Sequence, residues 1–348
     1  MHHRILPLFA FALVTAGACL AVDAPALDAA GTRAAFLKLI DRPVVALAPE
    51  VKAPVQNGEL VRIDFSYMAE AGQRVPGVII KPASATGRRP VVISLHGTGG
   101  TKESNMAFMN SLAKSGITAV AIDARYHGGR MKSGKGTEEY VNAILESYRT
   151  GKEHPFFFDT VWDVRRLIDY LETRDDIDPK RIGLFGTSKG GIETYLATAV
   201  EPRVAVAVPC IGVESFRWAA ENNSWQSRVG TFQAAFDTAA KDEGVANAGG
   251  EFLHKFYAKA APGIDREFDG PAMVPLIAPR PLLSINGDID PRTPTAGLNL
   301  CVVAGRAAYA AAGAPEKFVL KLQPNTGHKV TPEGFAAAHD WFVQWLKP

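Results

Sequence analysis

The chain has 348 residues, of which 47% are hydrophobic and 21% charged, so it can bury the core of one large α/β domain or two small ones. Its 38 Lys and Arg against 36 Asp and Glu give a formal net charge of +2. No strong positive field is present to recruit nucleic acid or an acidic membrane surface, so we expect a small or neutral substrate.

The first residues have the features of a secretory signal. A basic start at Arg4 is followed by an apolar run and then by small residues that end at Ala18. The apolar run is too short to span a bilayer. Residues 1–24 are therefore predicted to be a signal peptide, with cleavage after Ala18 or near Ala24 fitting equally well.

The cysteines indicate whether the protein carries a lipid anchor and whether it contains a disulfide. Cys19 is a weak match to a bacterial lipoprotein site, because the usual Leu three residues before the cysteine is missing. Ordinary cleavage with export, to the periplasm or the medium, is favoured over a lipid anchor. Cys210 and Cys301 lie in apolar stretches, so two buried thiols are favoured over a disulfide.

The predicted domain, residues 25–348, begins with a leader and a hairpin. Residues 26–54 are helix-like at first and then rich in proline, as expected of a leader on the surface. Residues 59–83 alternate with period two, which predicts two antiparallel strands that could edge a larger sheet.

Short apolar runs then alternate with helical stretches. Strands are predicted at PVVISLHG, ITAVAIDAR, RIGLFG, VAVAVPCIG, PRPLLSINGD and KFVLKLQ, and helices at MAFMNSLAKSG, FFDTVWDVRRLIDYLETR, and residues 192–200, 298–312 and 332–346. Continuous apolar runs indicate strands that are covered on both faces. The predicted fold class is therefore α/β, with a mostly parallel, doubly wound sheet and an N-terminal antiparallel edge.

The alternation stops over residues 213–275, a predicted insertion rich in aromatic side chains. Active sites of open α/β sheets lie at the carboxyl ends of the strands, so the insertion could form a lid over such a site. A helical subdomain with its own aromatic core is the equally weighted alternative.

One short segment, GTSKG at residues 186–190, suggests chemistry. Taken alone, Ser188 would more often be a turn residue than a nucleophile. Here the segment fits Gly-x-Ser-x-Gly between a predicted strand and a predicted helix, which is the context of a nucleophile elbow. In such an elbow the serine Oγ projects above the sheet, and flanking glycines let strand and helix approach closely.

A serine nucleophile needs a base, and the base needs a carboxylate, in the chain order Ser, acid, His for this context. NTGHKVTP supplies His328, and NGDIDPRTP supplies Asp288 and Asp290. Asp290 is preferred to Asp288, because a residue beyond the turn can reach a histidine in the next strand's loop. HGTGG follows an earlier strand, so the backbone N–H groups of Thr98 and Lys189 are assigned to an oxyanion hole.

Other polar residues in these segments have structural interpretations. His96, Asp123 and His127 are expected to brace loops, and Glu214 and His254 have no assignable role. No His, Cys and carboxylate spacing is typical of a metal site, and no dinucleotide fingerprint is present. We therefore expect no cofactor.

The segments HGTGG, DARYHGG, GTSKGG, NGDIDPRTP and TGHKVTP resemble the α/β-hydrolase superfamily, in its dienelactone hydrolase, acetyl xylan esterase and prolyl oligopeptidase-like branch. The resemblance runs from about Val91 to the C-terminus, excluding the insertion. It places the acid three residues after Gly287, which agrees with Asp290. Lys189 replaces the Gln or His common after the nucleophile in this family, which bears on substrate preference beside the elbow.

The motifs and the resemblance together predict an exported serine hydrolase that cleaves a small-molecule or carbohydrate ester, such as an acetyl ester, through an acyl-enzyme on Ser188. A peptidase acting on short peptides is the runner-up, because the chain lacks the long N-terminal propeller of prolyl oligopeptidase-like enzymes. A non-catalytic binding protein on a hydrolase scaffold is disfavoured, since all the catalytic parts are present.

Overall fold

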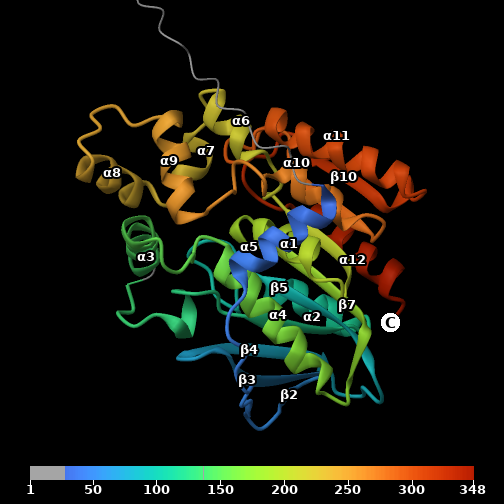
Figure 1. The fold of residues 1–348 in the computed structure, drawn as a ribbon. Helices are drawn as coiled ribbons and strands as arrows, with labels where there is room; N and C mark the ends of the chain where they lie inside the picture. The colour runs from blue at the N-terminus through green and yellow to red at the C-terminus, as the bar shows by residue number, and fades with distance from the viewer. Residues whose placement is uncertain (1–27, 136) are drawn as a thin grey trace, which may run out of the picture.

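The computed structural model describes residues 28–135 and 137–348 (Figure 1). The predicted signal peptide, both of its cleavage positions and Cys19 lie outside the described residues. Within the part that the structure describes, no helix combines the length and the apolar character that a membrane span requires.

A ten-stranded mixed sheet organises the chain, in the order β1-β3-β4-β6-β5-β7-β8-β9-β10, with β2 paired to β3. Strands β5 to β10 pair in parallel, whereas β1 to β4 pair antiparallel and β4 also runs antiparallel to β6. This confirms the mostly parallel sheet with an antiparallel N-terminal edge. The strands are β1 (Glu50–Val51), β2 (Val55–Asn57), β3 (Leu60–Glu70), β4 (Gln73–Pro82), β5 (Arg89–Leu95), β6 (Thr118–Ile122), β7 (Ile177–Thr187), β8 (Val204–Cys210), β9 (Leu282–Gly287) and β10 (Phe318–Gln323).

Helices cover both faces of the parallel part, which is why its strands are continuous apolar runs. One face is covered by α1 (Ala29–Ile40), α4 (Phe158–Glu172), α5 (Lys189–Val200) and α11 (Thr295–Ala311), whose buried side chains share one core. The other face is covered by α2 (Met106–Lys114) and α12 (Pro332–Leu346), which share a second core. Two short 3₁₀ turns, η1 (Gly128–Arg130) and η3 (Pro315–Lys317), lie in connections.

The topology creates a crevice between β5 and β7. These strands are neighbours, but the chain leaves β5 for α2 on one face and leaves β7 for α5 on the opposite face. Loops that depart to opposite faces open a crevice at the carboxyl ends of the strands, where open α/β sheets bind ligands. HGTGG and GTSKG are the segments that follow these two strands.

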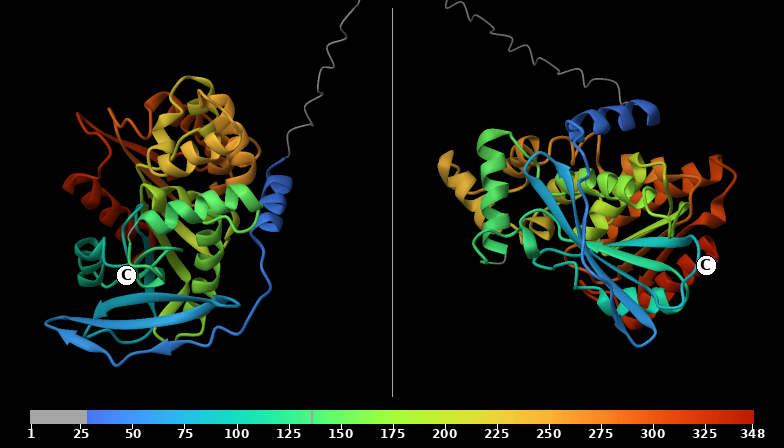
Figure 2. Two further views of the ribbon diagram at one scale, coloured as in Figure 1. Left: turned by 90° about the vertical axis from the view of Figure 1, so that its left-hand side faces the viewer. Right: turned by 90° about the horizontal axis from the view of Figure 1, so that it is seen from below.

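The insertion forms several helices, and Figures 1 and 2 show them on the side of the molecule opposite the β3–β4 hairpin. They are α6 (Phe216–Glu221), α7 (Gln226–Val229), α8 (Gln233–Asp242), α9 (Gly250–Ala260), α10 (Gly270–Met273) and the 3₁₀ turn η2 (Val274–Ile277). Helix α3 (Thr137–Thr150), which the sequence analysis did not predict, packs against α8 and α9.

An aromatic cluster joins the insertion to the rest of the domain. Phe256 of α9 stacks on Phe232 and on Tyr148 of α3, with ring centroids 5.4 and 4.9 Å apart. Phe156, in the loop before α4, packs edge-on against Phe232 at 4.6 Å. The insertion therefore has an aromatic core, as one of the two interpretations expected, but shares it with α3 and the loop before α4.

Candidate active site

Ser188 stands at a sharp junction between β7 and α5. Its backbone has φ 55° and ψ −116°, a conformation that is strained for a residue with a side chain. The neighbouring glycines explain how the junction closes. A Cβ on Gly186 would lie 2.1 Å from the carbonyl oxygen of Gly190, and one on Gly190 would lie 2.4 Å from that of Leu95, so only glycine fits at either position.

The structure brings three predicted residues from distant segments together at the carboxyl edge of the sheet. His328, after β10, has its Nε2 2.8 Å from the Oγ of Ser188. Its Nδ1 lies 2.8 and 3.0 Å from the two carboxylate oxygens of Asp290, in the loop after β9. An ionised carboxylate only accepts, so Nδ1 carries the proton and Nε2 is left to accept the serine O–H.

Asp290 is held as an anion in a buried position. Its side chain also accepts hydrogen bonds from the backbone N–H groups of Arg292 and Thr293, at 2.8 and 3.2 Å. Burial opposes ionisation, but the hydrogen bond and charge of His328, the Arg292 N–H and the positive charge of Arg228 together lower the pKa of Asp290 below its usual value.

The alternative acid, Asp288, points to a different partner. Its Oδ1 accepts the backbone N–H of Thr326 at 3.1 Å. Backbone N–H groups of Thr326 and Asn325 lower the pKa of Asp288. Asp288 thus braces the loop that carries His328, whereas Asp290 contacts His328 itself.

Thr98 and Lys189 both line the same pocket as Ser188. No described residue accepts a hydrogen bond from the backbone N–H of Thr98 or from that of Lys189. Lys189 is the first residue of α5, so its N–H has no partner in a preceding helical turn. Its side chain is buried and pairs with Glu193, one turn further along α5.

The histidine of HGTGG is a structural residue, as expected. Nε2 of His96 accepts the backbone N–H of Ala124 at 3.1 Å, so Nδ1 donates to the carbonyl of Gly97 at 2.8 Å. Burial, with the nearby charge of Lys189, lowers the pKa of His96 to about 4. Asp123 likewise holds loops together, because it accepts the backbone N–H groups of Lys102 and Gly129.

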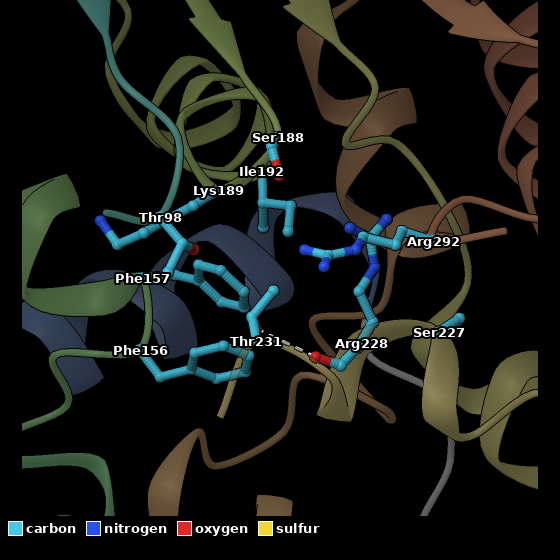
Figure 3. A pocket seen from close by; sticks show the side chains of 10 residues that line it. All are labelled: Thr98, Phe156, Phe157, Ser188, Lys189, Ile192, Ser227, Arg228, Thr231 and Arg292. Atoms are coloured by element: carbon cyan, nitrogen blue, oxygen red, sulfur yellow. Dashed lines mark hydrogen bonds between the residues drawn. The ribbon is translucent and has the colours of Figure 1, made fainter. Parts of the chain in front are cut away.

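A small, narrow pocket, partly open to solvent, lies against Ser188 (Figure 3). Its wall combines residues of the elbow and HGTGG with three other segments: the loop before α4, the insertion, and the loop after β9. The lining residues are Thr98, Phe156, Phe157, Ser188, Lys189, Ile192, Ser227, Arg228, Thr231 and Arg292.

Sequence reasoning missed several of these residues. Arg292 stands inside the NGDIDPRTP segment, two residues after Asp290, so its position near the site could have been inferred. Arg228 could not, because its placement depends on how the insertion folds. Phe157 has φ 85°, an unfavourable backbone conformation for a side chain of this size, and no sequence pattern signals it.

Arg228 links the insertion to the loop of Asp290. Its Nε donates to Glu214 at 2.6 Å, and its Nη2 donates to the hydroxyl of Thr293 at 3.1 Å. Complete burial raises the pKa of Glu214 to about 7, although the charge of Arg228 opposes the rise. Glu214, which had no assigned role, therefore serves as the buried partner of a pocket arginine.

Two further observations concern cysteine and metal chemistry. Cys210 and Cys301 are free, buried thiols, as the sequence analysis favoured. Across residues 28–135 and 137–348, no three His, Cys, Asp or Glu side chains gather closely enough to hold a metal ion.

Comparisons with known proteins identify the family of the chain. The model of the family "Glucuronyl esterase, fungi" matches residues 72–313, a range that includes the insertion, which the motif resemblance had left out, and ends before His328. A putative hydrolase of Bacillus subtilis, YtaP, is 25% identical over 79% of this chain and 84% of its own length. The 4-O-methyl-glucuronoyl methylesterase of Neurospora crassa is 26% identical over 72% of this chain and 59% of its own length.

Solved structures agree on the fold. The acetyl xylan esterase 1 of a Thermoanaerobacterium species superposes with a TM-score of 0.67 at 20% identity, covering 91% of this chain and 93% of that one. A glucuronoyl esterase from Solibacter usitatus gives 0.62 at 16% identity, covering 90% and 92%. The predicted α/β-hydrolase resemblance is thereby confirmed. The chain belongs to the glucuronyl esterase family and is a carboxylic ester hydrolase of the α/β-hydrolase fold.

Proposed function

We propose that this protein hydrolyses a carboxylic ester of a carbohydrate through an acyl-enzyme on Ser188, with His328 as the base and Asp290 as its orienting acid. The observation that carries the proposal is the 2.8 Å contact between Nε2 of His328 and Oγ of Ser188, inside a pocket at the crevice of the sheet. A serine hydroxyl becomes an effective nucleophile only when such a base can take its proton.

The steps follow from this geometry. Oγ of Ser188 attacks the ester carbonyl while Nε2 of His328 takes its proton, and Asp290 stabilises the imidazolium that results. The backbone N–H groups of Thr98 and Lys189 donate to the oxyanion of the tetrahedral intermediate. His328 then gives its proton to the leaving alcohol, and a water that it deprotonates releases the acid from Ser188.

The substrate class is suggested by the relatives. One is named as a methylesterase of 4-O-methyl-glucuronoyl esters and another as an acetyl esterase of xylan. The first name describes a sugar on the acid side of the ester, and the second describes a sugar on the alcohol side. We propose a carbohydrate ester for this chain, with the two sides to be separated by experiment.

The test is replacement of the nucleophile. In Ser188→Ala, hydrolysis of p-nitrophenyl acetate should fall by at least about a thousandfold, because removing the nucleophile leaves only the oxyanion hole and binding. Labelling by a fluorophosphonate, followed by intact mass, should disappear as well. Ser84→Ala, an exposed serine in the loop between β4 and β5, is the matched control and should keep both. Retention of most of the rate by Ser188→Ala would refute the assignment.

Substrate panels then separate the candidates. Release of methanol from methyl glucuronate glycosides and of acetate from acetylated xylo-oligosaccharides distinguishes a sugar acid from a sugar alcohol. Amides with the same acyl groups test the peptidase alternative, which would gain support from comparable amide and ester rates.

Export is part of the proposal and rests on residues 1–24. Expression of the full chain in a bacterial host should give a processed protein outside the cytoplasm, and its N-terminal sequence would distinguish cleavage near Ala18 from cleavage near Ala24. A Cys19→Ala variant that is processed in the same way would argue against a lipid anchor.

A further inference from the structure

We propose that the pocket beside Ser188 recognises a carboxylate on the substrate, separate from the ester that is cleaved, and that Arg292 and Arg228 provide this anion subsite. The inference rests on the proposed esterase function and deepens it, because it names a charged group that the preferred substrate carries.

The first step concerns the charges in the pocket wall. Its lining includes three cationic side chains and no carboxylate. Lys189 forms a buried ion pair with Glu193, and Arg228 forms one with Glu214. Arg292 lines the pocket but is also exposed, and it forms no ion pair with a carboxylate among the described residues, so it is free to pair with a ligand.

The second step concerns position. Figure 3 shows the Arg292 side chain extending into the pocket toward Ile192, below Ser188. The backbone N–H of Arg292 donates to Asp290 at 2.8 Å, so the chain is fixed to the catalytic loop at this residue. A group bound by the guanidinium would therefore lie in the same pocket as Ser188.

The third step concerns Arg228, which adds a second, rigid donor. It is 5% exposed, and its Nε and Nη2 are held by Glu214, Thr293 and the carbonyl of Gly212. None of the described residues accepts a hydrogen bond from its Nη1, and the residue lines the pocket. Two guanidinium groups around one cavity suit a planar, two-oxygen anion, which arginine binds better than lysine does.

The ligand is thus a carboxylate carried by the ester substrate, either on its acyl part or on its alcohol part. A uronic acid unit next to the esterified one has this chemistry, and so does a half-ester of a dicarboxylic acid. Neutral acetyl esters lack it and would leave Arg292 unpaired.

The test compares matched esters that differ only in charge. On the acyl side the pair is p-nitrophenyl hydrogen adipate and its carboxamide analogue. On the alcohol side the pair is 4-carboxyphenyl acetate and 4-carbamoylphenyl acetate. The readout is the ratio of kcat/KM for carboxylate over carboxamide within each pair, after subtraction of uncatalysed hydrolysis.

We expect this ratio to reach about tenfold or more in one of the pairs, because a hydrogen bond between charged groups contributes that much. The pair that shows it identifies the side that carries the carboxylate. Arg292→Met should bring the ratio close to one, and added salt should reduce it. Arg88→Met is the matched control: it removes an exposed arginine at the amino end of β5, opposite the site, and should preserve the ratio.

Ratios near one in both pairs, or a ratio that survives Arg292→Met, would overturn the anion subsite while leaving the esterase itself intact. Failure of the wild type to hydrolyse either neutral ester, together with no fluorophosphonate labelling, would instead mean that the proposed function has failed. Arg228 is left unchanged in the test, because its removal would leave the buried Glu214 without its ion-pair partner.

Discussion

Two aspartates in one short loop have different partners because the chain turns between them. Asp288 directly follows β9 and receives the backbone N–H of Thr326, whereas Asp290 lies beyond the turn and faces His328. Both carboxylates keep a lowered pKa, so ionisation alone does not distinguish their roles. Only Asp290 can hold the imidazole with Nδ1 protonated.

The prediction at this scale compares two isosteric changes. Asp290→Asn should lower kcat for p-nitrophenyl acetate by roughly 10³–10⁴-fold, because an amide favours the wrong histidine tautomer while the geometry survives. Asp288→Asn should cost less than about tenfold, since its role is to brace a loop and loop hydrogen bonds are individually weak. Steady-state kinetics and circular dichroism of both variants provide the measurement. Equal losses of kcat in the two variants would show that Asp290 is not the acid of the triad.

For Lys189, the sequence predicted the position of the backbone but not the direction of the side chain. Its place directly after Ser188 predicted a backbone N–H at the first turn of α5, which is where the structure has it. The direction of its side chain could not be predicted. The ammonium is drawn to Glu193, one helical turn away, and both groups are buried, so its charge is neutralised within the protein.

At the scale of elements, one buried carboxylate, that of Asp269, joins the starts of two helices of the insertion. Asp269 accepts the hydroxyl of Ser215 at 2.5 Å and the backbone N–H of Phe216 at 2.7 Å, at the start of α6. It also accepts the N–H of Gly270 at 2.8 Å, at the start of α10. Burial raises the pKa of Asp269 to about 6, although these hydrogen bonds oppose the rise.

This pKa predicts a pH dependence that can be attributed to one residue. The folded state binds the Asp269 proton more tightly than the unfolded chain does, so the stability that it contributes is fully present below the ordinary aspartate pKa. That contribution is lost as the pH rises through about 6, by an amount on the order of 3 kcal/mol. Asp269→Asn cannot titrate, so the melting temperature of the wild type relative to this variant should increase from pH 6.5 to pH 4.

Thermal unfolding of the two proteins in parallel buffers measures this difference. Asp237→Asn is the control, because Asp237 lies on the outer side of α8 and its change should give no such trend. A difference between wild type and Asp269→Asn that stays constant across the range would contradict the raised pKa.

The elements differ in how well the sequence predicted them. Strands β5 to β10 were predicted because each is a short apolar run with turn residues at both ends. Helix α3 was missed because the burial of its side chains depends on tertiary contacts: Tyr140 packs against His127, and Tyr148 stacks on Phe256 of α9. The position of Arg228 could not be predicted for the same reason, since its partners Glu214 and Thr293 lie 14 and 65 residues away in the chain.

At the scale of the whole molecule, a buried network of charges joins the N-terminal hairpin to the parallel sheet. Arg125, after β6, bonds Glu70 at the end of β3 at 2.8 Å and Asp163 of α4 at 3.2 Å. Arg130 bonds the other oxygen of Asp163 at 2.5 Å and also reaches Gln73 at the start of β4. The DARYHGG segment and Arg130, which follows it, therefore connect the β3–β4 hairpin and the end of β6 to the covering helix α4.

Arg125 is 2% exposed at its side chain, and Asp163 is fully buried, so removal of the cation should be costly. Arg125→Met should lower the free energy of unfolding at pH 7 by about 3–5 kcal/mol, because it leaves buried carboxylates with too little compensating charge. Arg149→Met is the control: its ion pair with Asp242 is 46% and 43% exposed, so the loss should be about 0–1 kcal/mol.

The pH dependence of the same variant separates lost charge from lost packing. Burial opposes ionisation of Asp163, but Arg125 and Arg130 hold its pKa below the usual value. A lowered folded pKa gives stability that is present above the ordinary aspartate pKa and is lost as the pH falls through the folded pKa. Arg125→Met removes part of that stability, so the gap between wild type and variant should be widest at neutral pH and should narrow in acid. Urea unfolding at pH 7, 4 and 3 measures the gap, and a gap that is independent of pH would mean that Arg125 acts through packing alone.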